Sequence, residues 1–365
     1  MNKKIVCLID SLGSGGAERQ IVGLAVLLRQ KGYSVELLSY HSEEFYSTIA
    51  REGGINPVIL RTKNNAISKL LAVRDYIRRT GGCDWLITYK GGPNAIGCIL
   101  RMLGGNFRLI VSERTSNRSR KLSTSDKMRY QLYRLATVVS PNSYTESEFI
   151  KENYPWLKNK TKTITNFTQT NFFVPSETLN HQNINILTVA RVSKTKNIIN
   201  VIEAINKLKQ EGLNNVHFDW YGRVPKGQEE YASLCLKTID NYGLNNFVSF
   251  HPASSDILPI YQNCDIFMLP SLYEGFPNVI CEAMSCGKPI ICSNVCDNPQ
   301  IVGDGENGLL FDPNNVDDIA KALYKVINMS WDKLQQWGKI SRKKATETFS
   351  EESFVNKYID IIEQS

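Results

Sequence analysis

Two carboxylates and two cations in the C-terminal half of the chain have the types and spacing to do chemistry together. Glu274 and Glu282 lie eight positions apart, and Lys196 follows Arg191 by five. Carboxylate oxygens accept hydrogen bonds from sugar or ribose hydroxyl groups, and two cations can neutralise a diphosphate without a metal ion. These residues therefore favour a site for a phosphorylated sugar or nucleotide. The alternative for the two cations is ordinary surface charge.

The elements around the two glutamates indicate how the chain could present them. Ile266–Leu269 is a short apolar run of the kind found in buried parallel strands. A loop follows and carries Glu274. A helix then begins near Asn278, ends at Gly287 and carries Glu282 one turn from its start. The unpaired N–H groups at such a helix start carry partial positive charge and suit a phosphate.

The sequence around these residues resembles a known family. EGFPNVICEAMSCGKPI, residues 274–290, is similar to the E-x7-E signature of family-4 retaining glycosyltransferases. VARVSKTK, residues 189–196, resembles the strand-end pattern of that family. The resemblance is strong over about residues 184–318 and weaker before them. It implies the GT-B fold, an α/β architecture in which two Rossmann-like, doubly wound parallel-sheet domains face a cleft.

The resemblance also implies roles for individual residues. Arg191 and Lys196 would hold the donor diphosphate, Glu274 would hold the donor sugar or the leaving group, and these three are the catalytic candidates. Glu282 would accept hydrogen bonds from the ribose hydroxyls, and the backbone around His251 would hold the nucleotide base. The implied donor-binding residues are Gly16, Gly222, Arg223, His251, Gly275, Phe276, Pro277, Asn278, Val279 and Glu282.

A glycine-rich segment, SLGSGGAER, follows the first predicted strand at residues 11–19. A dinucleotide-binding fingerprint set on Gly13 and Gly15 needs glycine or alanine at position 18, where the chain has Glu18, so a nicotinamide site is not favoured. Glycine here serves either a tight turn with positive φ or a close approach to a ligand. The resemblance implies the second, with Gly15 near the acceptor and Gly16 near the donor phosphates.

The segment SERT, residues 112–115, ends the predicted strand Arg108–Val111. Many members of the family have a histidine near this strand end. SERT is similar to the subset that acts on lipid-linked or cell-surface oligosaccharide precursors. Glu113 and Arg114 could bind an acceptor hydroxyl and phosphate, or they could form a local ion pair on the surface.

Charge divides unevenly along the chain. Residues 1–166 hold 26 basic and 13 acidic residues, net +13, and residues 167–365 hold 17 and 23, net −6. Residues 101–134 alone hold nine basic and two acidic residues. This excess favours an anionic partner such as a phosphate-bearing acceptor, a membrane or nucleic acid. Aromatic residues do not alternate with the basic ones, which disfavours nucleic acid. Residues 118–129 are either a basic loop that leads into an amphipathic helix at a membrane face or a solvated run of charge.

Cysteine and hydropathy patterns predict a cytoplasmic protein. The nine cysteines form no C-x-x-C pair, and the four histidines are scattered, so neither a disulfide framework nor a zinc site is favoured. No apolar run reaches the ~20 residues that span a bilayer. The first residues enter a strand directly, without the apolar segment of a signal peptide.

Alternating apolar runs and helical patterns predict repeated βα units in two domains. Residues 1–166 form the N-terminal domain, which the resemblance assigns to the acceptor. Residues 167–183 are polar and predict a linker, and residues 184–350 form the donor domain. The resemblance implies that a last helix, about residues 351–365, packs back on the first domain. The helices predicted in the first domain are 17–31, 45–51, 67–79, 94–102, 126–135 and 145–152.

The sequence contains no Asp-x-Asp pair, the carboxylate pair of many metal-dependent sugar transferases. We therefore expect a metal-independent enzyme without a cofactor. The resemblance implies a retaining transferase that moves a hexose or N-acetylhexosamine from a UDP-sugar to a lipid-linked or lipopolysaccharide-type acceptor, as in O-antigen synthesis. We expect it at the inner face of the plasma membrane, bound peripherally. The alternatives are a nucleotide-sugar epimerase or phosphorylase on a similar fold, and a non-catalytic UDP-sugar-binding homologue.

Overall fold

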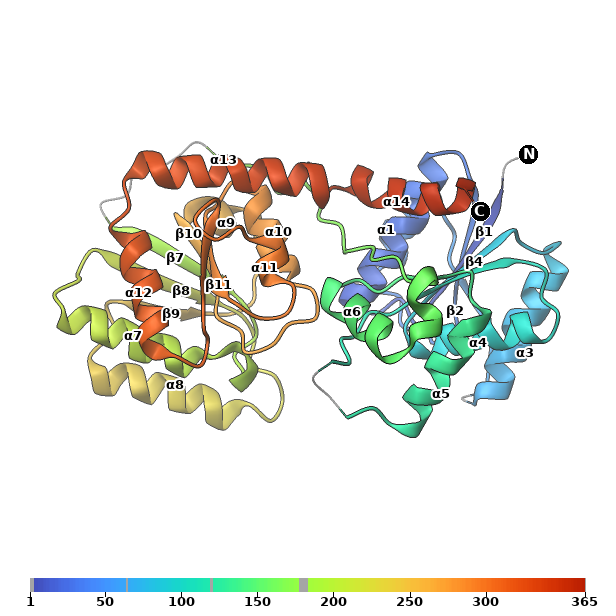
Figure 1. Ribbon diagram of the computed structural model, residues 1–365, viewed down its shortest axis with the longest axis horizontal. Helices are drawn as coiled ribbons and strands as arrows, with labels where there is room; N and C mark the ends of the chain where they lie inside the picture. The colour runs from blue at the N-terminus through green and yellow to red at the C-terminus, as the bar shows by residue number, and fades with distance from the viewer. Residues whose placement is uncertain (1–2, 64, 119–120, 177–182, 365) are drawn as a thin grey trace. The chain divides into compact units, whose positions relative to one another are not determined.

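The computed structural model describes residues 3–63, 65–118, 121–176 and 183–364, which divide into two compact units (Figure 1). The first unit comprises residues 1–166 and 352–365, and the second comprises residues 167–351. The described part of each unit contains one parallel sheet of six strands. Because parallel strands must be joined by crossovers, helices follow the strands in both units.

The sheet of the first unit has the strand order β3-β2-β1-β4-β5-β6. Its central strand, β1, pairs Cys7 with Leu37 on one side and with Ile87 on the other. These residues are fully buried, as expected for strands covered on both faces. The strands are β1 (Lys4–Leu8), β2 (Ser34–Ser39), β3 (Val58–Ile59), β4 (Trp85–Tyr89), β5 (Arg108–Ser112) and β6 (Val138–Val139).

Helices from both ends of the chain cover the first sheet. Val73 and Ile77 of α3 and Tyr130 of α5 join the strands in one buried cluster. Residues of the C-terminal helix belong to this unit, since the Tyr358 hydroxyl bonds that of Tyr89 (2.8 Å). The helices are α1 (Gly16–Gln30), α2 (Ser47–Glu52), α3 (Ala66–Arg79), α4 (Gly91–Met102), α5 (Thr124–Leu132), α6 (Tyr144–Asn153) and α14 (Glu351–Gln364).

The sheet of the second unit has the strand order β12-β11-β10-β7-β8-β9. Its strands are β7 (Ile184–Val189), β8 (Val216–Tyr221), β9 (Val248–His251), β10 (Ile266–Leu269), β11 (Ile290–Ser293) and β12 (Gly308–Phe311). Figure 1 shows α7, α8 and α12 on one face and α9 and α10 on the other, and a separate buried cluster lies against each face. The helices are α7 (Ile198–Gln210), α8 (Glu229–Tyr242), α9 (Leu258–Asn263), α10 (Asn278–Ser285), α11 (Asn298–Ile301), α12 (Val316–Ile327) and α13 (Trp331–Thr348).

The segment that we expected to be a linker begins inside the second unit. Phe173 is buried and its ring meets that of Tyr261 edge-on, at 5.6 Å between centroids. The Nη1 atom of Arg342 donates to the carbonyl oxygens of Thr170 (2.9 Å) and Phe173 (2.8 Å). The buried residues of this segment are therefore packed against the second unit, whereas residues 169, 171, 172, 175 and 176 are exposed. Residues 177–182 of the expected linker lie outside the described residues.

A helix that spans a bilayer needs about 20 predominantly apolar residues. In the described ranges, no helix combines the length and the apolar composition that a membrane span needs.

Candidate active site

Backbone contacts hold the carboxyl ends of β7, β8 and β9 close together. The Gly222 N–H donates to the His251 carbonyl (3.0 Å), and the Ala190 N–H donates to the Tyr221 carbonyl (2.9 Å). A β-carbon on Gly222 would lie 1.9 Å from the Ala190 carbonyl oxygen. No side chain tolerates so close an approach to backbone, so position 222 requires glycine.

Lys196 and Glu274 form an ion pair at this edge of the second sheet. Lys196 ends a 3₁₀ turn after β7, and Glu274 lies in the loop after β10. Lys196 Nζ contacts Glu274 Oε1, and each side chain has only 13% of its surface exposed. The same Oε1 accepts a hydrogen bond from Ser271 Oγ (2.6 Å). The structure thus brings two of the three catalytic candidates together.

Buried polar side chains support the loop that carries Glu274. Ser293 Oγ donates to the Ser271 carbonyl (2.6 Å), and Asn298 Nδ2 donates to the Ser293 carbonyl (2.8 Å). The Glu274 N–H donates to Cys296 Sγ (3.4 Å). Ser271, Ser293 and Asn298 are fully buried. Because the chain of bonds runs into the core, the position of Glu274 is set from within the unit.

Arg191 has a different environment from Lys196. Its side chain is exposed and makes no ion pair or side-chain hydrogen bond with another described residue. The structure therefore does not join Arg191 to the Lys196–Glu274 pair. It leaves the Arg191 guanidinium available to an anion from outside.

Glu282 lies in the second turn of α10 and is held from the core side. The Tyr261 hydroxyl donates to Glu282 Oε2 (2.9 Å), and only 7% of Glu282 is exposed. Burial, followed by the charge of Glu282, raises the pKa of Tyr261 well above its usual value, so the phenol remains a donor. The carboxylate that the resemblance assigns to ribose hydroxyls is thus already oriented by a tyrosine.

The residues between the two glutamates differ in exposure. Gly275 has open space where a β-carbon would lie, and Asn278 and Val279 are partly exposed at the start of α10. Phe276 and Pro277 are buried. The first three can touch a ligand, whereas the last two shape the loop.

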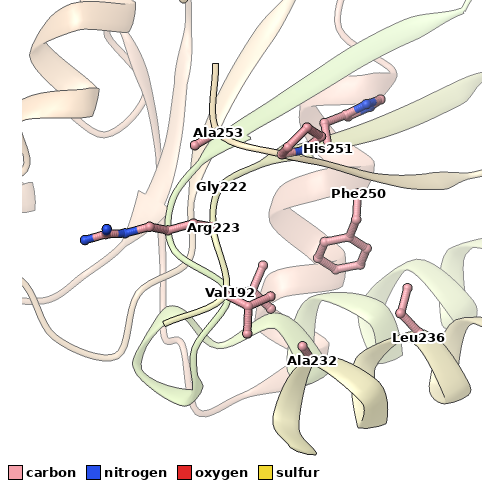
Figure 2. A pocket seen from close by; sticks show the side chains of 10 residues that line it. Val192, Gly222, Arg223, Ala232, Leu236, Phe250, His251 and Ala253 are labelled. Carbon is pink, nitrogen blue, oxygen red and sulfur yellow. The ribbon is translucent and has the colours of Figure 1, made fainter. Parts of the chain in front are cut away.

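A hollow of about 360 Å³ lies beside the strand ends of β8 and β9 (Figure 2). Its walls are mainly apolar: the Phe250 ring, Val192, and Ala232 and Leu236 of α8. Gly222 adds backbone at the rim. Apolar walls with a few backbone polar groups are typical of pockets for small molecules.

Phe250 and His251 point to opposite sides of β9, as successive strand residues do (Figure 2). Phe250 enters the hollow. The His251 ring instead stacks on Tyr221, with centroids 4.3 Å apart, and its Nε2 contacts Asp219 Oδ1 (2.6 Å). His251 therefore offers the hollow its backbone. The Arg223 guanidinium extends away from the Phe250 ring.

In the first unit, Lys90 lies at the carboxyl end of β4 with a strained backbone. Its φ of 74° and ψ of 161° fall in a region that almost only glycine adopts. Its Nζ pairs with Asp10 Oδ1 (3.0 Å) and Glu18 Oε1 (2.5 Å). Two carboxylates therefore hold this cation at the edge of the first sheet.

Gly15 and Gly16 begin α1 beside this cluster. Gly15 has a φ of −91°, so positive φ is not the reason for glycine at this position. A β-carbon there would lie 2.2 Å from Glu18 Oε2. Glycine lets the Glu18 side chain fold back toward Lys90, and Gly16 is the first residue of the helix.

Glu113 and Arg114 do not form the surface ion pair that was one of the two alternatives. Glu113 is buried and accepts a hydrogen bond from Arg129 Nε (3.2 Å). The Arg114 guanidinium stacks on the Tyr89 ring, 3.7 Å from its centroid, and donates to Asn166 Oδ1 (2.8 Å). Both side chains are thus engaged within the first unit.

A second buried carboxylate, Glu146, supports the segment after SERT. It accepts hydrogen bonds from the Asn117 N–H (2.6 Å) and the Tyr130 hydroxyl (2.7 Å). Burial raises the pKa of Glu146 to about 7, even though these hydrogen bonds act in the opposite direction. This part of the first unit is therefore sensitive to pH near neutrality.

Comparison with known proteins decides the class of this site. Residues 169–344, nearly all of the second unit, match the family model "Glycosyl transferases group 1". The second unit therefore resembles this group over nearly its whole length, and the relatives support a glycosyltransferase. An uncharacterized glycosyltransferase of Haemophilus influenzae is 27% identical over 338 residues, which cover 89% of this chain and 91% of the relative.

Two further likenesses extend over the whole glycosyltransferase. The N-acetylgalactosamine-N,N'-diacetylbacillosaminyl-diphospho-undecaprenol 4-alpha-N-acetylgalactosaminyltransferase of Campylobacter jejuni is 25% identical over 370 residues, 95% of this chain and 96% of that one. The structure of Anabaena HepE in complex with UDP matches with a TM-score of 0.86 and 20% identity, covering 99% of this chain and 100% of the other. The GT-B fold that the resemblance implied is confirmed.

Several polar residues at the strand ends of the glycosyltransferase were not expected from the sequence. Two had a usable signal: Ser271 lies two positions after the end of β10, and Lys90 directly follows β4 in the segment YKGGPN, residues 89–94. Asp10, Glu18, Ser293 and Cys296 contact partners at least 22 positions away and had no such signal. Asn298 contacts Ser293, five positions away, and also had none. The unexpected residues are Asp10, Glu18, Lys90, Ser271, Ser293, Cys296 and Asn298.

Proposed function

We propose that the glycosyltransferase moves a hexose or N-acetylhexosamine from a UDP-sugar to a lipid-linked or lipopolysaccharide-type acceptor, with retention of configuration and without a metal ion. The observation that carries the proposal is the Lys196–Glu274 ion pair, held by Ser271 at the edge of the second sheet. Because the cation and the carboxylate are held side by side, Lys196 can bind the diphosphate of a donor while Glu274 binds a hydroxyl of its sugar.

The reaction breaks the bond between the anomeric carbon of the donor and its phosphate oxygen, and UDP leaves with the electron pair. An acceptor hydroxyl forms the new bond to that carbon on the same face, and its proton passes to a UDP oxygen. Arg191 and Lys196 stabilise the charge that develops on the diphosphate. Lys196 gives up part of its contact with Glu274 to do so, which frees Glu274 for a hydroxyl of the donor sugar.

The hollow beside β9 supports a uridine donor. Its apolar walls and the Phe250 ring suit the faces of a pyrimidine, and the backbone at His251 suits the polar edge. Anabaena HepE, which has the same fold, was solved with UDP. Glu282, oriented by Tyr261, then accepts hydrogen bonds from the ribose hydroxyls.

The acceptor class rests on the first unit and on a relative. The Campylobacter jejuni relative is named for transfer to a diphospho-undecaprenol-linked sugar. The net charge of +13 over residues 1–166 suits a diphosphate acceptor in an anionic membrane. We place the enzyme in the cytoplasm, peripheral to the inner face of the plasma membrane, with Gly15, Glu113 and Arg114 at the acceptor.

The decisive experiment measures UDP release from a panel of UDP-sugars with membrane lipid extract as the acceptor source, with and without EDTA. We expect release that depends on the extract and is unchanged by EDTA. Lys196→Ala and Glu274→Ala should abolish it, while Lys325→Ala, at an exposed position of α12, should leave it intact. Normal turnover in both site variants would refute the proposal.

The same assay separates the alternatives. An epimerase would convert one UDP-sugar into another without extract. A non-catalytic homologue would be stabilised by UDP against thermal unfolding but would turn over no donor with any extract.

A further inference from the structure

The excess of basic residues at positions 101–134 suggested that residues 118–129 meet the membrane, yet most of those cations are engaged inside the first unit. Arg101 donates to the carbonyl of Phe107 (2.5 Å). Arg129 pairs with Glu113 and Asp126, and Arg134 lies over the Trp156 ring at 4.4 Å. These three guanidinium groups have partners within the unit, so they are not free to bind lipid headgroup phosphates directly.

Helix α3 presents a different arrangement. Ile67, Leu71, Arg74 and Arg78 follow one another at spacings of four, three and four residues, so they form one stripe along the helix. Ile67 is 71% exposed and Leu71 is 45% exposed. Arg74 and Arg78 are exposed and make no ion pair or side-chain hydrogen bond within the described residues. The stripe is about 16 Å long at 1.5 Å per residue.

The end of α4 extends this stripe into a surface. Arg74 and Arg78 line a hollow of about 470 Å³ together with Leu103 and the backbone of Gly104 and Gly105. Leu103 is 58% exposed, and its neighbour Met102 is 60% exposed. Aliphatic side chains therefore project on both sides of two unpaired guanidinium groups. Asp75 is the exposed acidic residue on the same helix.

We propose that this α3–α4 surface, consisting of Ile67, Leu71, Arg74, Arg78, Met102 and Leu103, docks the glycosyltransferase on an anionic lipid bilayer. The aliphatic and thioether side chains enter the region between headgroups and acyl chains, and the two arginines bind headgroup phosphates, one of which fits the hollow. This inference rests on the proposed function, because docking on a bilayer brings the enzyme to an acceptor that is anchored in the membrane.

The chemistry of the surface favours lipid over a protein partner. The centres of protein interfaces are enriched in aromatic residues as well as in methionine and arginine, and none of the six residues of this surface is aromatic. Here the large exposed side chains are aliphatic or thioether, and arginines lie between them. The net charge of +13 over residues 1–166 adds attraction to an anionic bilayer at a distance.

The test uses the full chain and co-sedimentation with vesicles of phosphatidylcholine, with or without phosphatidylglycerol, at low and high salt. We expect binding only to the anionic vesicles, weakened by salt. Arg74→Glu/Arg78→Glu should lower the partition at least 25-fold, since each basic residue near such a surface changes it about 5-fold. Ile67→Ser/Leu71→Ser should weaken binding with less dependence on salt.

Two matched controls sharpen the test. Lys121→Glu/Lys127→Glu changes the same charge at exposed positions of the segment suggested by the sequence, and Leu234→Ser removes an exposed leucine of α8. Both should bind vesicles as the wild type does. Loss of binding in the Lys121/Lys127 variant with retention in the α3 variants would overturn the proposal.

Two other outcomes also overturn it. One is a wild-type protein that ignores anionic vesicles at low salt. The other is a dimer, seen by light scattering, that the α3 variants dissociate. Stabilisation by UDP, measured on the same preparations, separates these failures from failure of the proposed function. If the protein binds UDP but not vesicles, the proposed donor site is retained and only the proposed docking surface is refuted.

Discussion

The cations at the carboxyl edges of the two sheets differ in how many carboxylates they pair with. In the second unit, Arg191 has no internal partner in the described residues, and Lys196 shares a single carboxylate. In the first unit, Lys90 and Arg129 each lie between two carboxylates. A cation already offset by two carboxylates gains little from a phosphate. The difference teaches that net charge is a poor guide to where an anion binds, since the more basic half of the chain has the more fully paired edge.

The largest expected effect tests this difference directly. Lys196→Ala should lower kcat by about 10²–10³-fold, because it removes a charge that stabilises the leaving diphosphate. Lys90→Ala should lower kcat less than tenfold under the same steady-state conditions, because Lys90 serves Asp10 and Glu18. Equal losses in the two variants would break the comparison.

The second prediction compares two glycines at the two edges. Gly222→Ala should destabilise the protein by about 3 kcal/mol, because its β-carbon would meet the Ala190 backbone at 1.9 Å. Gly91→Ala should cost less than about 1 kcal/mol, because the nearest atom, at 2.9 Å, is the end of the flexible Arg129 side chain. Urea unfolding measures both. A Gly91 variant as unstable as the Gly222 variant would show that the first edge is equally rigid.

The third prediction concerns pH and the first unit alone. The pKa of Glu146 rises from 4.5 to about 7 on folding, so the folded state keeps this proton longer than the unfolded state does. Between pH 4.5 and 7 the free energy of unfolding should therefore fall by up to about 3 kcal/mol through this group as pH rises.

Glu146→Gln removes that titration. The stability of the variant relative to the wild type should rise between pH 5 and pH 7.5, as measured by urea unfolding at both. Glu148→Gln, at an exposed position of the same helix, is the control and should show no such change. A relative stability of Glu146→Gln that does not vary with pH would contradict the assignment.

The smallest expected effect concerns the strained backbone of Lys90. Both Lys90→Gly and Lys90→Ala lose the two ion pairs, but only glycine adopts a φ of 74° and a ψ of 161° without strain. The glycine variant should therefore be more stable than the alanine variant by about 1 kcal/mol in urea unfolding. The opposite order would mean that the backbone relaxes once the lysine is gone.

The second unit was largely predictable because its signals are local. The strand Ile266–Leu269 and the helix from Asn278 follow from an apolar run and a proline–glycine pair that lie close in sequence. Lys196 and Glu274 came from short motifs, and the structure joins them. Their support from Ser293 and Asn298 was not predictable, because contacts between loops leave no pattern in the sequence.

Boundaries in the first unit were harder to predict. α4 begins at Gly91, three residues before the predicted start. The prediction missed the first turn because it contains two glycines and a proline, which have low helix propensity. α5 begins at Thr124, where Ser123 and Asp126 form a capping box that the prediction passed over. The role of Arg129 was also missed, since only the fold brings it to Glu113.

The bonds from Arg342 to Thr170 and Phe173 bear on how the second unit could be isolated as a fragment. A fragment that starts at Ile184, the first residue of β7, would lack Phe173. The Phe173 ring packs against Tyr261, which orients Glu282. It would also remove two of the three carbonyl oxygens that the partly buried Arg342 Nη1 bonds, leaving only that of Ser285. Autonomous folding of this unit therefore demands a cut before Phe167, seventeen positions upstream of its first β-strand.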